Sequence, residues 1–455
     1  MQATRFGVRA ALIAAAALAI CLQSEAGAQN RNSALVVTNV RIFDAARGTF
    51  TEPQELLIRD GRIARIGNAA NANADAPRID AGGAYALPGL WDSHVHLSWL
   101  TVRGGDTLAA TLDSMARHGV LYVRDVGGPL NVIAGIARRT ANGELRGPTI
   151  FYAGPMAERP PLYWAGSNTV LPGWTVPIES DRDVDELVAK VADAGGSFVK
   201  AFGKWDRRLF RLLRSRASAR SLGVVVDPGT PLFQDLPVDS LLAIGVTSIE
   251  HAHSPWLSLL RTDLRVRHDS IFAAGGDPSR RGAFATEVIG LGPASFQDGQ
   301  LRRLGETWKR SGIFFTPTLN VSESRRKSLP PVPMTNSEEE RARFWNGWAD
   351  ASVEVTRSLA SQGIPLLIGQ DNIEPMVTFE EMELLARVGV PPADILRAAT
   401  LNAARAVKRE ADLGSIETGK VGDLVLFRGN PIEDIRRVRA PFLVVRKGEV
   451  ILRRD

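Results

Sequence analysis

Both ends of the chain carry short runs in which apolar and polar residues alternate, a pattern typical of antiparallel strands. Residues 35–44 (LVVTNVRIFD) and 55–67 (ELLIRDGRIARIG) show it near the start, and Asp60-Gly61 is a hairpin signal between two such runs. Residues 423–427 and 442–452 show it near the end, with a turn at Lys447-Gly448. Because strands are predicted at both ends around a different centre, we expect the ends to share one sheet module.

The centre alternates short apolar runs with helical patterns, which favours parallel βα units. Eight runs are predicted to be strands: 87–96, 121–125, 150–154, 198–202, 223–227, 248–251, 313–316 and 365–371. Eight parallel strands predict a closed (β/α)8 barrel of the TIM type, an α/β fold whose working residues lie at the carboxyl ends of the strands.

Two segments, 154–177 and 253–300, are predicted to be long loops on that face. Tyr163, Trp164 and Trp174 in the first loop favour an apolar substrate face, with packing over the barrel mouth as the alternative. Arg159 is a candidate for binding a carboxylate, with an ordinary surface arginine as the alternative.

The first 28 residues have the pattern of a signal peptide. Arg5 and Arg9 precede an apolar run at 10–22 that is short for a membrane span, and residues 26–28 (AGA) form a cleavage site. We expect export to the periplasm or medium with cleavage after Ala28. Cys21, the single cysteine, lies in this segment, so the mature chain would form no disulfide. Lipid attachment at Cys21 is the less favoured alternative, because Ile20 stands where a small residue is wanted.

The 455-residue length suits one large barrel with a smaller domain. The 44% hydrophobic content indicates a globular protein. The net charge is only +5 and basic residues form no long run, which argues against nucleic-acid binding. No later stretch is long and apolar enough to predict a membrane span, and the oligomeric state is left open.

Polar residues that can bind metals or transfer protons stand at the predicted ends of four strands. They are His94, His96, Lys200, His251 and Asp371. His94 and His96 point the same way if their segment is a strand, which would make half of a metal site. Taken singly, a strand lysine is usually snorkelling or paired, and an aspartate after a strand usually caps a turn. Five such residues on one barrel rim favour a shared site.

The pattern of HxH on strand one, lysine on strand four, histidine on strand six and aspartate on strand eight resembles the amidohydrolase superfamily, with the imidazolonepropionase and prolidase-like enzymes as the nearest branch. The resemblance runs from about residue 33 to the end and includes the stretches ALPGLWDSHVHL, HGVLYVRDVGG, ELLARVGVPPADILRAATLNAARAV and LGSIETGKVGDLVLFRGNPIEDI. It implies a barrel domain at 86–410 and a small β-sandwich built from 29–85 and 411–455.

The resemblance also implies roles for the strand-end residues. His94, His96 and Asp371 would hold one divalent metal, usually zinc. Lys200 would be carboxylated by CO₂ and bridge two metals, and His251 would bind the second. Two metals would share a hydroxide of lowered pKa, and Asp371 would pass a proton to the leaving nitrogen.

The sequence departs from the family at strand five, where the family has a second histidine and this chain has Asp227. Three interpretations follow. Asp227 is itself a metal ligand; or one metal is used and Lys200 stays an ammonium paired with Asp227; or the barrel is not catalytic. His253 is a further candidate for the missing imidazole. Arg124 and Asp125 are expected to form a structural ion pair below the metals.

These observations predict an exported metal-dependent hydrolase that cleaves a C–N bond in a small peptide-like molecule, a dipeptide or a cyclic amide, using one or two ions, most simply Zn²⁺. The alternatives are an ester or lactone hydrolase on the same site and a binding protein on a barrel that has lost its activity.

Overall fold

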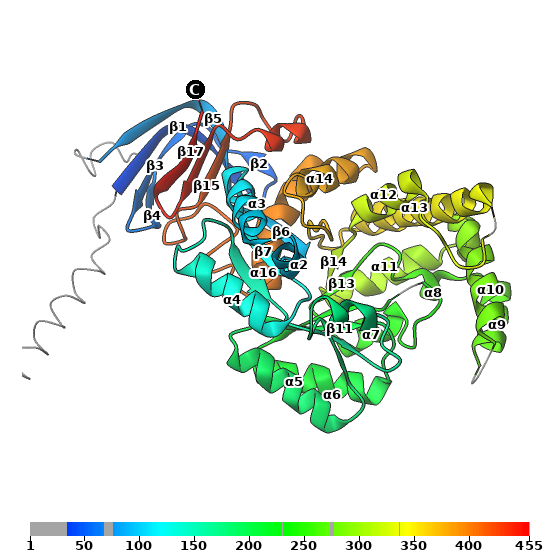
Figure 1. Ribbon diagram of the computed structural model, residues 1–455. Helices are drawn as coiled ribbons and strands as arrows, with labels where there is room; N and C mark the ends of the chain where they lie inside the picture. The colour runs from blue at the N-terminus through cyan, green and yellow to red at the C-terminus, as the bar shows by residue number, and fades with distance from the viewer. Residues whose placement is uncertain (1–33, 68–75, 230, 274–276, 336, 455) are drawn as a thin grey trace, which may run out of the picture.

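The computed structural model describes residues 34–67, 76–229, 231–273, 277–335 and 337–454 (Figure 1). The predicted signal peptide at 1–28, with Cys21 and the cleavage position, lies outside the described residues. Within the described ranges, every helix is too short or too polar to cross a bilayer.

Strands from the two ends of the chain form one sheet, as the alternating patterns predicted. Its order is β17-β16-β15-β5-β1-β3-β4, with β2 paired to β1. The antiparallel pairing of β15 with β5 joins the C-terminal strands to the N-terminal ones (Figure 1). The members are β1 (Ala34–Asp44), β2 (Thr49–Phe50), β3 (Gln54–Arg59), β4 (Arg62–Ile66), β5 (Arg78–Pro88), β15 (Leu424–Phe427), β16 (Leu443–Arg446) and β17 (Glu449–Arg453).

The centre of the chain contains two parallel sheets. One has the order β6-β7-β8, and the other β10-β9-β11-β12-β13-β14. The strands are β6 (Leu90–Val95), β7 (Val120–Asp125), β8 (Thr149–Tyr152), β9 (Met156–Glu158), β10 (Thr175–Pro177), β11 (Phe198–Phe202), β12 (Gly223–Asp227), β13 (Ser248–Glu250) and β14 (Phe314–Thr316). The residues of β7 and β11, for example, are buried on both faces, as expected of parallel strands covered by helices.

The eighth predicted strand, at 365–371, is not a regular strand. It forms only isolated bridges, from Leu366 to Phe315 and from Asn372 to Val95. These bridges still place the segment between β14 and β6. The α/β class and the parallel strands are therefore confirmed, and a fully closed eight-stranded barrel stays a prediction.

Helices follow most of the parallel strands and bury one face each. In α5, for example, Val184, Leu187, Val188 and Val191 recur at helical spacing and are buried. The α-helices are α2 (Ser98–Val102), α3 (Gly105–Arg117), α4 (Leu130–Ala141), α5 (Asp181–Asp193), α6 (Arg207–Ala219), α7 (Val238–Ile244), α8 (Trp256–Leu259), α9 (Thr262–Phe272), α10 (Pro278–Gly290), α11 (Gln300–Ser311), α12 (Leu319–Ser328), α13 (Glu338–Ser361), α14 (Val377–Arg387), α15 (Pro392–Arg397) and α16 (Ala403–Ala406). Shorter helical turns are η1 (Ala165–Thr169), η2 (Gly292–Ser295), η3 (Ala398–Asn402) and η4 (Ile435–Arg439).

The segment 253–300, predicted to be a loop, instead contains α8, α9 and α10. Phe284, Ala285, Val288 and Ile289 of α10 lie on one face and share an apolar cluster with aromatic residues of α13. The helical spacing of these residues explains the difference, because a helix gives them a common face to bury.

The buried carboxyl group of Glu381 joins α14 to α12. Glu381 of α14 accepts hydrogen bonds from the backbone N–H groups of Leu319 and Asn320, at the start of α12. Burial raises the pKa of Glu381 to about 8, although the two backbone bonds act against this rise. Between its ordinary pKa near 4.5 and this raised value, Glu381 therefore keeps its proton in the folded chain and releases it in the unfolded chain.

We expect Glu381 to make stability fall as pH rises from its ordinary pKa near 4.5 to about 8. Glu381→Gln keeps an acceptor oxygen and removes the titration. The unfolding free energy of this variant, relative to the parent, should rise across that window by on the order of a few kcal/mol. Denaturant unfolding at pH 5 and pH 8 measures the difference, with Glu380→Gln on the exposed side of the helix as the matched control. The prediction would be contradicted if the unfolding free energy of Glu381→Gln differed from that of the parent by the same amount at both pH values.

Candidate metal centre

Three of the predicted residues converge at the end of β6. His94 and His96 come from that strand and the residue just after it, and Asp371 comes from the bridging segment 365–372. One carboxylate oxygen of Asp371 lies 3.3 Å from Nε2 of His94 and 3.2 Å from Nε2 of His96. The three donor atoms lie within 4.8 Å of one another. The strand alternation that predicted a shared direction for the two imidazoles thus places both beside the same carboxylate.

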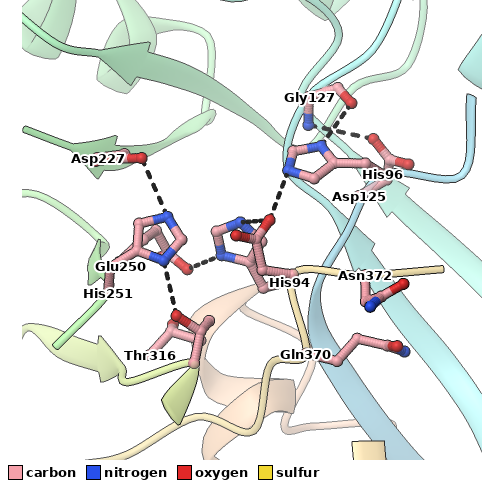
Figure 2. A network of polar contacts seen from close by, with 12 residues as sticks. His94, His96, Asp125, Gly127, Asp227, Glu250, His251, Thr316, Gln370 and Asn372 are labelled. Atoms are coloured by element: carbon pink, nitrogen blue, oxygen red, sulfur yellow. Dashed lines mark hydrogen bonds and ion pairs between the residues drawn. The ribbon is translucent and has the colours of Figure 1, made fainter. Parts of the chain in front are cut away.

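The other nitrogen of each imidazole is already engaged. Nδ1 of His94 is 2.7 Å from a carboxylate oxygen of Glu250, and Nδ1 of His96 is 2.9 Å from the carbonyl oxygen of Gly127 (Figure 2). An acceptor at Nδ1 holds the proton there and leaves the Nε2 lone pair available, which is the usual arrangement of metal-binding histidines.

This donor set fits a divalent metal. Ligand atoms about 2.1 Å from one ion in a tetrahedral arrangement lie roughly 3.4 Å apart, close to the spacings from Asp371 to the two histidines. Burial acts to raise the pKa of the Asp371 carboxyl, but the neighbouring histidines, His94 foremost, hold it well below its ordinary value. Asp371 is thus an anion ready to accept a cation.

Asp371 and His251 share an unusual backbone conformation. Their φ angles are +49° and +69°, in the left-handed region that few side chains adopt without cost. Such conformations persist where the surroundings impose them, and they cluster at functional sites. The backbone N–H of Asp371 donates to the carbonyl oxygen of His94 at 2.8 Å, which ties the carboxylate to the strand carrying the histidines.

His251 lies on the opposite side of the group and pairs with Asp227. Its Nε2 is 3.1 Å from a carboxylate oxygen of Asp227 (Figure 2). Its Nδ1 is 2.7 Å from the hydroxyl of Thr318. The ring centres of His251 and His94 are 4.8 Å apart. Burial acts to raise the pKa of Asp227, but the His251 charge keeps it below its ordinary value.

All six predicted site residues line one pocket of about 480 Å³, a volume that suits a small-molecule ligand. Lys200 of β11 is buried there, yet within the described ranges no carboxylate oxygen comes within 4.0 Å of its ammonium. The pairing of Lys200 with Asp227 considered above is therefore not formed, because Asp227 pairs with His251 instead.

His253 does not take the place of the missing imidazole. Its ring stacks on His251, with centres 5.2 Å apart and planes 5° from parallel, and it packs against Trp348. Burial, together with the neighbouring His251, lowers the pKa of His253 to about 3. It is therefore a neutral packing partner behind His251, outside the set of residues that line the pocket.

The expected ion pair between Arg124 and Asp125 is wrong. Arg124 donates to Glu250 at 2.8 Å, while Asp125 accepts from the backbone N–H of Leu97. Neighbouring residues on a strand point to opposite faces, so these two side chains cannot meet. Burial raises the pKa of Asp125 to about 7.

Glu250 is the site residue that the sequence analysis missed. It is fully buried and joins His94 to Arg124. The signal was present, since a glutamate and an arginine each sit inside an apolar strand and such charges need a buried partner. Which strands bring the partners together cannot be read from spacing alone.

The pocket walls differ in character. One wall is apolar and contains Trp99, Met156, Trp164, Trp174 and Phe202, which agrees with the apolar face predicted for the first long segment. Arg159, a candidate for carboxylate binding in the sequence, does not line the pocket, in line with the alternative of a surface arginine, whereas Arg103 and Arg325 do.

Comparison with known proteins gives three kinds of match. A family model described as "Amidohydrolase family" matches residues 292–451. An imidazolonepropionase of Thermoplasma acidophilum is 23% identical over 409 residues, covering 84% of this chain and 85% of that protein. A dihydroorotase of Syntrophotalea carbinolica is 46% identical over 63 residues, but this chain spans only 14% of its length. The crystal structure of a Xaa-Pro dipeptidase with bound methionine covers 92% of this chain and 99% of its own, with 18% identity and a TM-score of 0.69.

Proposed function

We propose, since the predicted relationship to the amidohydrolase superfamily is confirmed, that this chain is a metal-dependent hydrolase of a C–N bond in a small peptide-like or cyclic amide. The observation that carries the proposal is the group of His94, His96 and Asp371, whose donor atoms converge while hydrogen bonds at each Nδ1 hold both Nε2 atoms toward the carboxylate. The similarity to an imidazolonepropionase over 84% of this chain supports the proposal.

A divalent metal, most simply zinc, would supply Lewis-acid chemistry at this group by polarising a carbonyl and lowering the pKa of water. The chain's own residues would transfer the proton and exclude water. Asp371 is 24% exposed on the pocket side and remains ionised, so it can accept a proton there and return it to a leaving nitrogen. The aromatic wall limits water around the substrate.

Lys200, Asp227 and His251 would form a second metal position beside the first. Among the described residues, no carboxylate oxygen lies within 4.0 Å of the buried side-chain nitrogen of Lys200. As a neutral amine, this nitrogen would combine with CO₂ and release one proton, and the resulting carbamate anion would be a metal ligand. Asp227 offers a hard oxygen donor where the family has an imidazole.

Purified protein is expected to hold divalent metal and to hydrolyse at least one member of a panel of N-acyl amino acids, dipeptides and lactams. Metal analysis and product assays measure the two properties separately. The matched esters show whether oxygen leaving groups are preferred. Protein that binds neither Zn²⁺ nor Mn²⁺ and stays inert when they are added would overturn the proposal.

Replacing Asp227 tests whether the chain has the second metal position. Asp227→Asn removes an anionic donor while keeping its size, so bound metal is expected to fall from about two ions per chain to about one. Asp227→His, which introduces the family's residue, should keep two. Metal content after dialysis provides the measurement. One ion per chain in the parent and both variants would favour a site for a single metal.

We further propose export after cleavage at Ala28, and a division into a barrel at 86–410 and a sheet domain from 29–85 with 411–455. The mass of the exported chain tests the first point, since it should begin at Gln29.

A further inference from the structure

We propose that Arg325 selects substrates that carry both a free carboxylate and a large apolar group. This inference rests on the proposed hydrolase function and names the class of molecule that the pocket admits.

The fold places Arg325 at the wall of the site. It lies on α12, which begins three residues after β14 ends, and it lines the same pocket as His94, His96 and Asp371. Helices α12 and α13 pack side by side (Figure 1). Glu381 fixes the start of α12 through the two backbone N–H groups described above.

Two aromatic rings orient the guanidinium. Its central carbon lies 5.3 Å from the ring centre of Trp345 and 5.7 Å from that of Trp348, both on α13. Stacking on aromatic faces holds the guanidinium plane and leaves the N–H groups at its edge free to donate. A planar fork of this kind matches the two oxygens of a carboxylate.

Arg325 also lacks an acidic partner in the part of the chain that the structure describes. The neighbouring Arg326 is paired with Glu323 and Asp350, and Arg103, the other arginine of the pocket, is paired with Glu374. A guanidinium that is half-buried, oriented and without a carboxylate suits an anionic ligand better than a structural role does.

The wall formed by Trp99, Met156, Trp164, Trp174 and Phe202 supplies the other half of the recognition. Aromatic side chains there provide a large apolar area for a bulky side group. Because Arg325, the aromatic wall and the metal group line the same pocket, the structure favours amides of amino acids that have an aromatic or large aliphatic side chain and an unblocked carboxylate.

The test compares N-acetyl-L-phenylalanine with its neutral analogue, N-acetyl-L-phenylalaninamide. The parent is expected to prefer the acid by ~10- to 100-fold in kcat/KM, the size of a charge-assisted pair in a pocket. Arg325→Met keeps contact with the two tryptophans but should abolish this preference by raising KM for the acid, with kcat little changed. Arg325→Lys should keep part of it. Arg326→Met, whose parent residue is paired outside the pocket, is the matched control.

A binding measurement separates this inference from the proposed function. Calorimetry with 3-phenylpropionate, against 3-phenylpropan-1-ol as the neutral probe, should show the acid binding the parent ~10- to 100-fold more tightly than Arg325→Met. If no amide is hydrolysed but this difference is found, the hydrolase proposal fails and the carboxylate site stands. If acid and neutral compounds bind and react alike, or if folded Arg325→Met keeps the parent's preference, the inference is overturned.

Discussion

Asp371→Asn is expected to lower kcat by ~10²- to 10⁴-fold, the range that a positioned acid–base group contributes. The carboxylate oxygen between the two Nε2 atoms is the group in the pocket that is ionised, partly exposed and placed beside the metal-binding histidines. An asparagine keeps the shape but cannot take up the proton. It also weakens the hold on a cation, so metal content and kcat need to be measured together on the same preparations.

Asp350→Asn is the matched control, since Asp350 of α13 pairs with Arg326 of α12 and does not line the pocket. Its kcat should equal that of the parent. Hydrolysis that survives Asp371→Asn in full would show that Asp371 is not the proton carrier. A parent protein without hydrolytic activity, whose ligand binding is unchanged by Asp371→Asn, would support the rival interpretation from the sequence, a binding protein on a barrel that has lost its activity.

The sequence predicts best those elements whose local pattern is compatible with only one kind of secondary structure. The runs 198–202 and 223–227 are short and mainly apolar, each with one charged residue, and they form β11 and β12 with the predicted bounds. His94 and His96 fall where strand alternation puts them on one side, beside Asp371. The run 365–371 matched the same apolar pattern but forms only isolated bridges. The sequence pattern alone does not show how many backbone hydrogen bonds a segment forms with its neighbouring strands.

Contacts between distant segments are what the sequence could not provide. Arg124 was assigned to its neighbour Asp125, although its partner Glu250 lies 126 positions away on another strand. Arg325 was not identified from the sequence, which offered Arg159 only as a candidate, and Arg159 does not line the pocket. In each case the residue type was informative, but its partner depends on the face and the strand order, which are properties of the folded chain.

The second large effect is expected from replacing Glu250. One of its carboxylate oxygens accepts from Arg124 at 2.8 Å and the other from Nδ1 of His94 at 2.7 Å. Both charged groups are almost completely buried. Burial acts to raise the pKa of Glu250, but Arg124 and His94 hold it below its ordinary value. One buried anion therefore neutralises an internal guanidinium and orients a metal-binding imidazole.

Glu250→Leu should damage stability and metal binding by separate routes. Leaving the buried Arg124 unpaired is expected to cost about 3–5 kcal/mol in the free energy of unfolding. Leaving Nδ1 of His94 without its acceptor should weaken metal affinity by ~10- to 100-fold. Denaturant unfolding of the metal-free protein measures the first effect, and metal titration against a chelator measures the second.

The double variant Arg124→Met with Glu250→Leu distinguishes the two routes. Removing the arginine together with the glutamate eliminates the unpaired charge, so much of the lost stability should return. His94 still lacks its acceptor, so metal affinity should stay low. Stability that remains low would show that the pair matters for more than its charge balance. Affinity that returns with stability would mean that Glu250 acts on the metal only through the fold, and not by orienting His94.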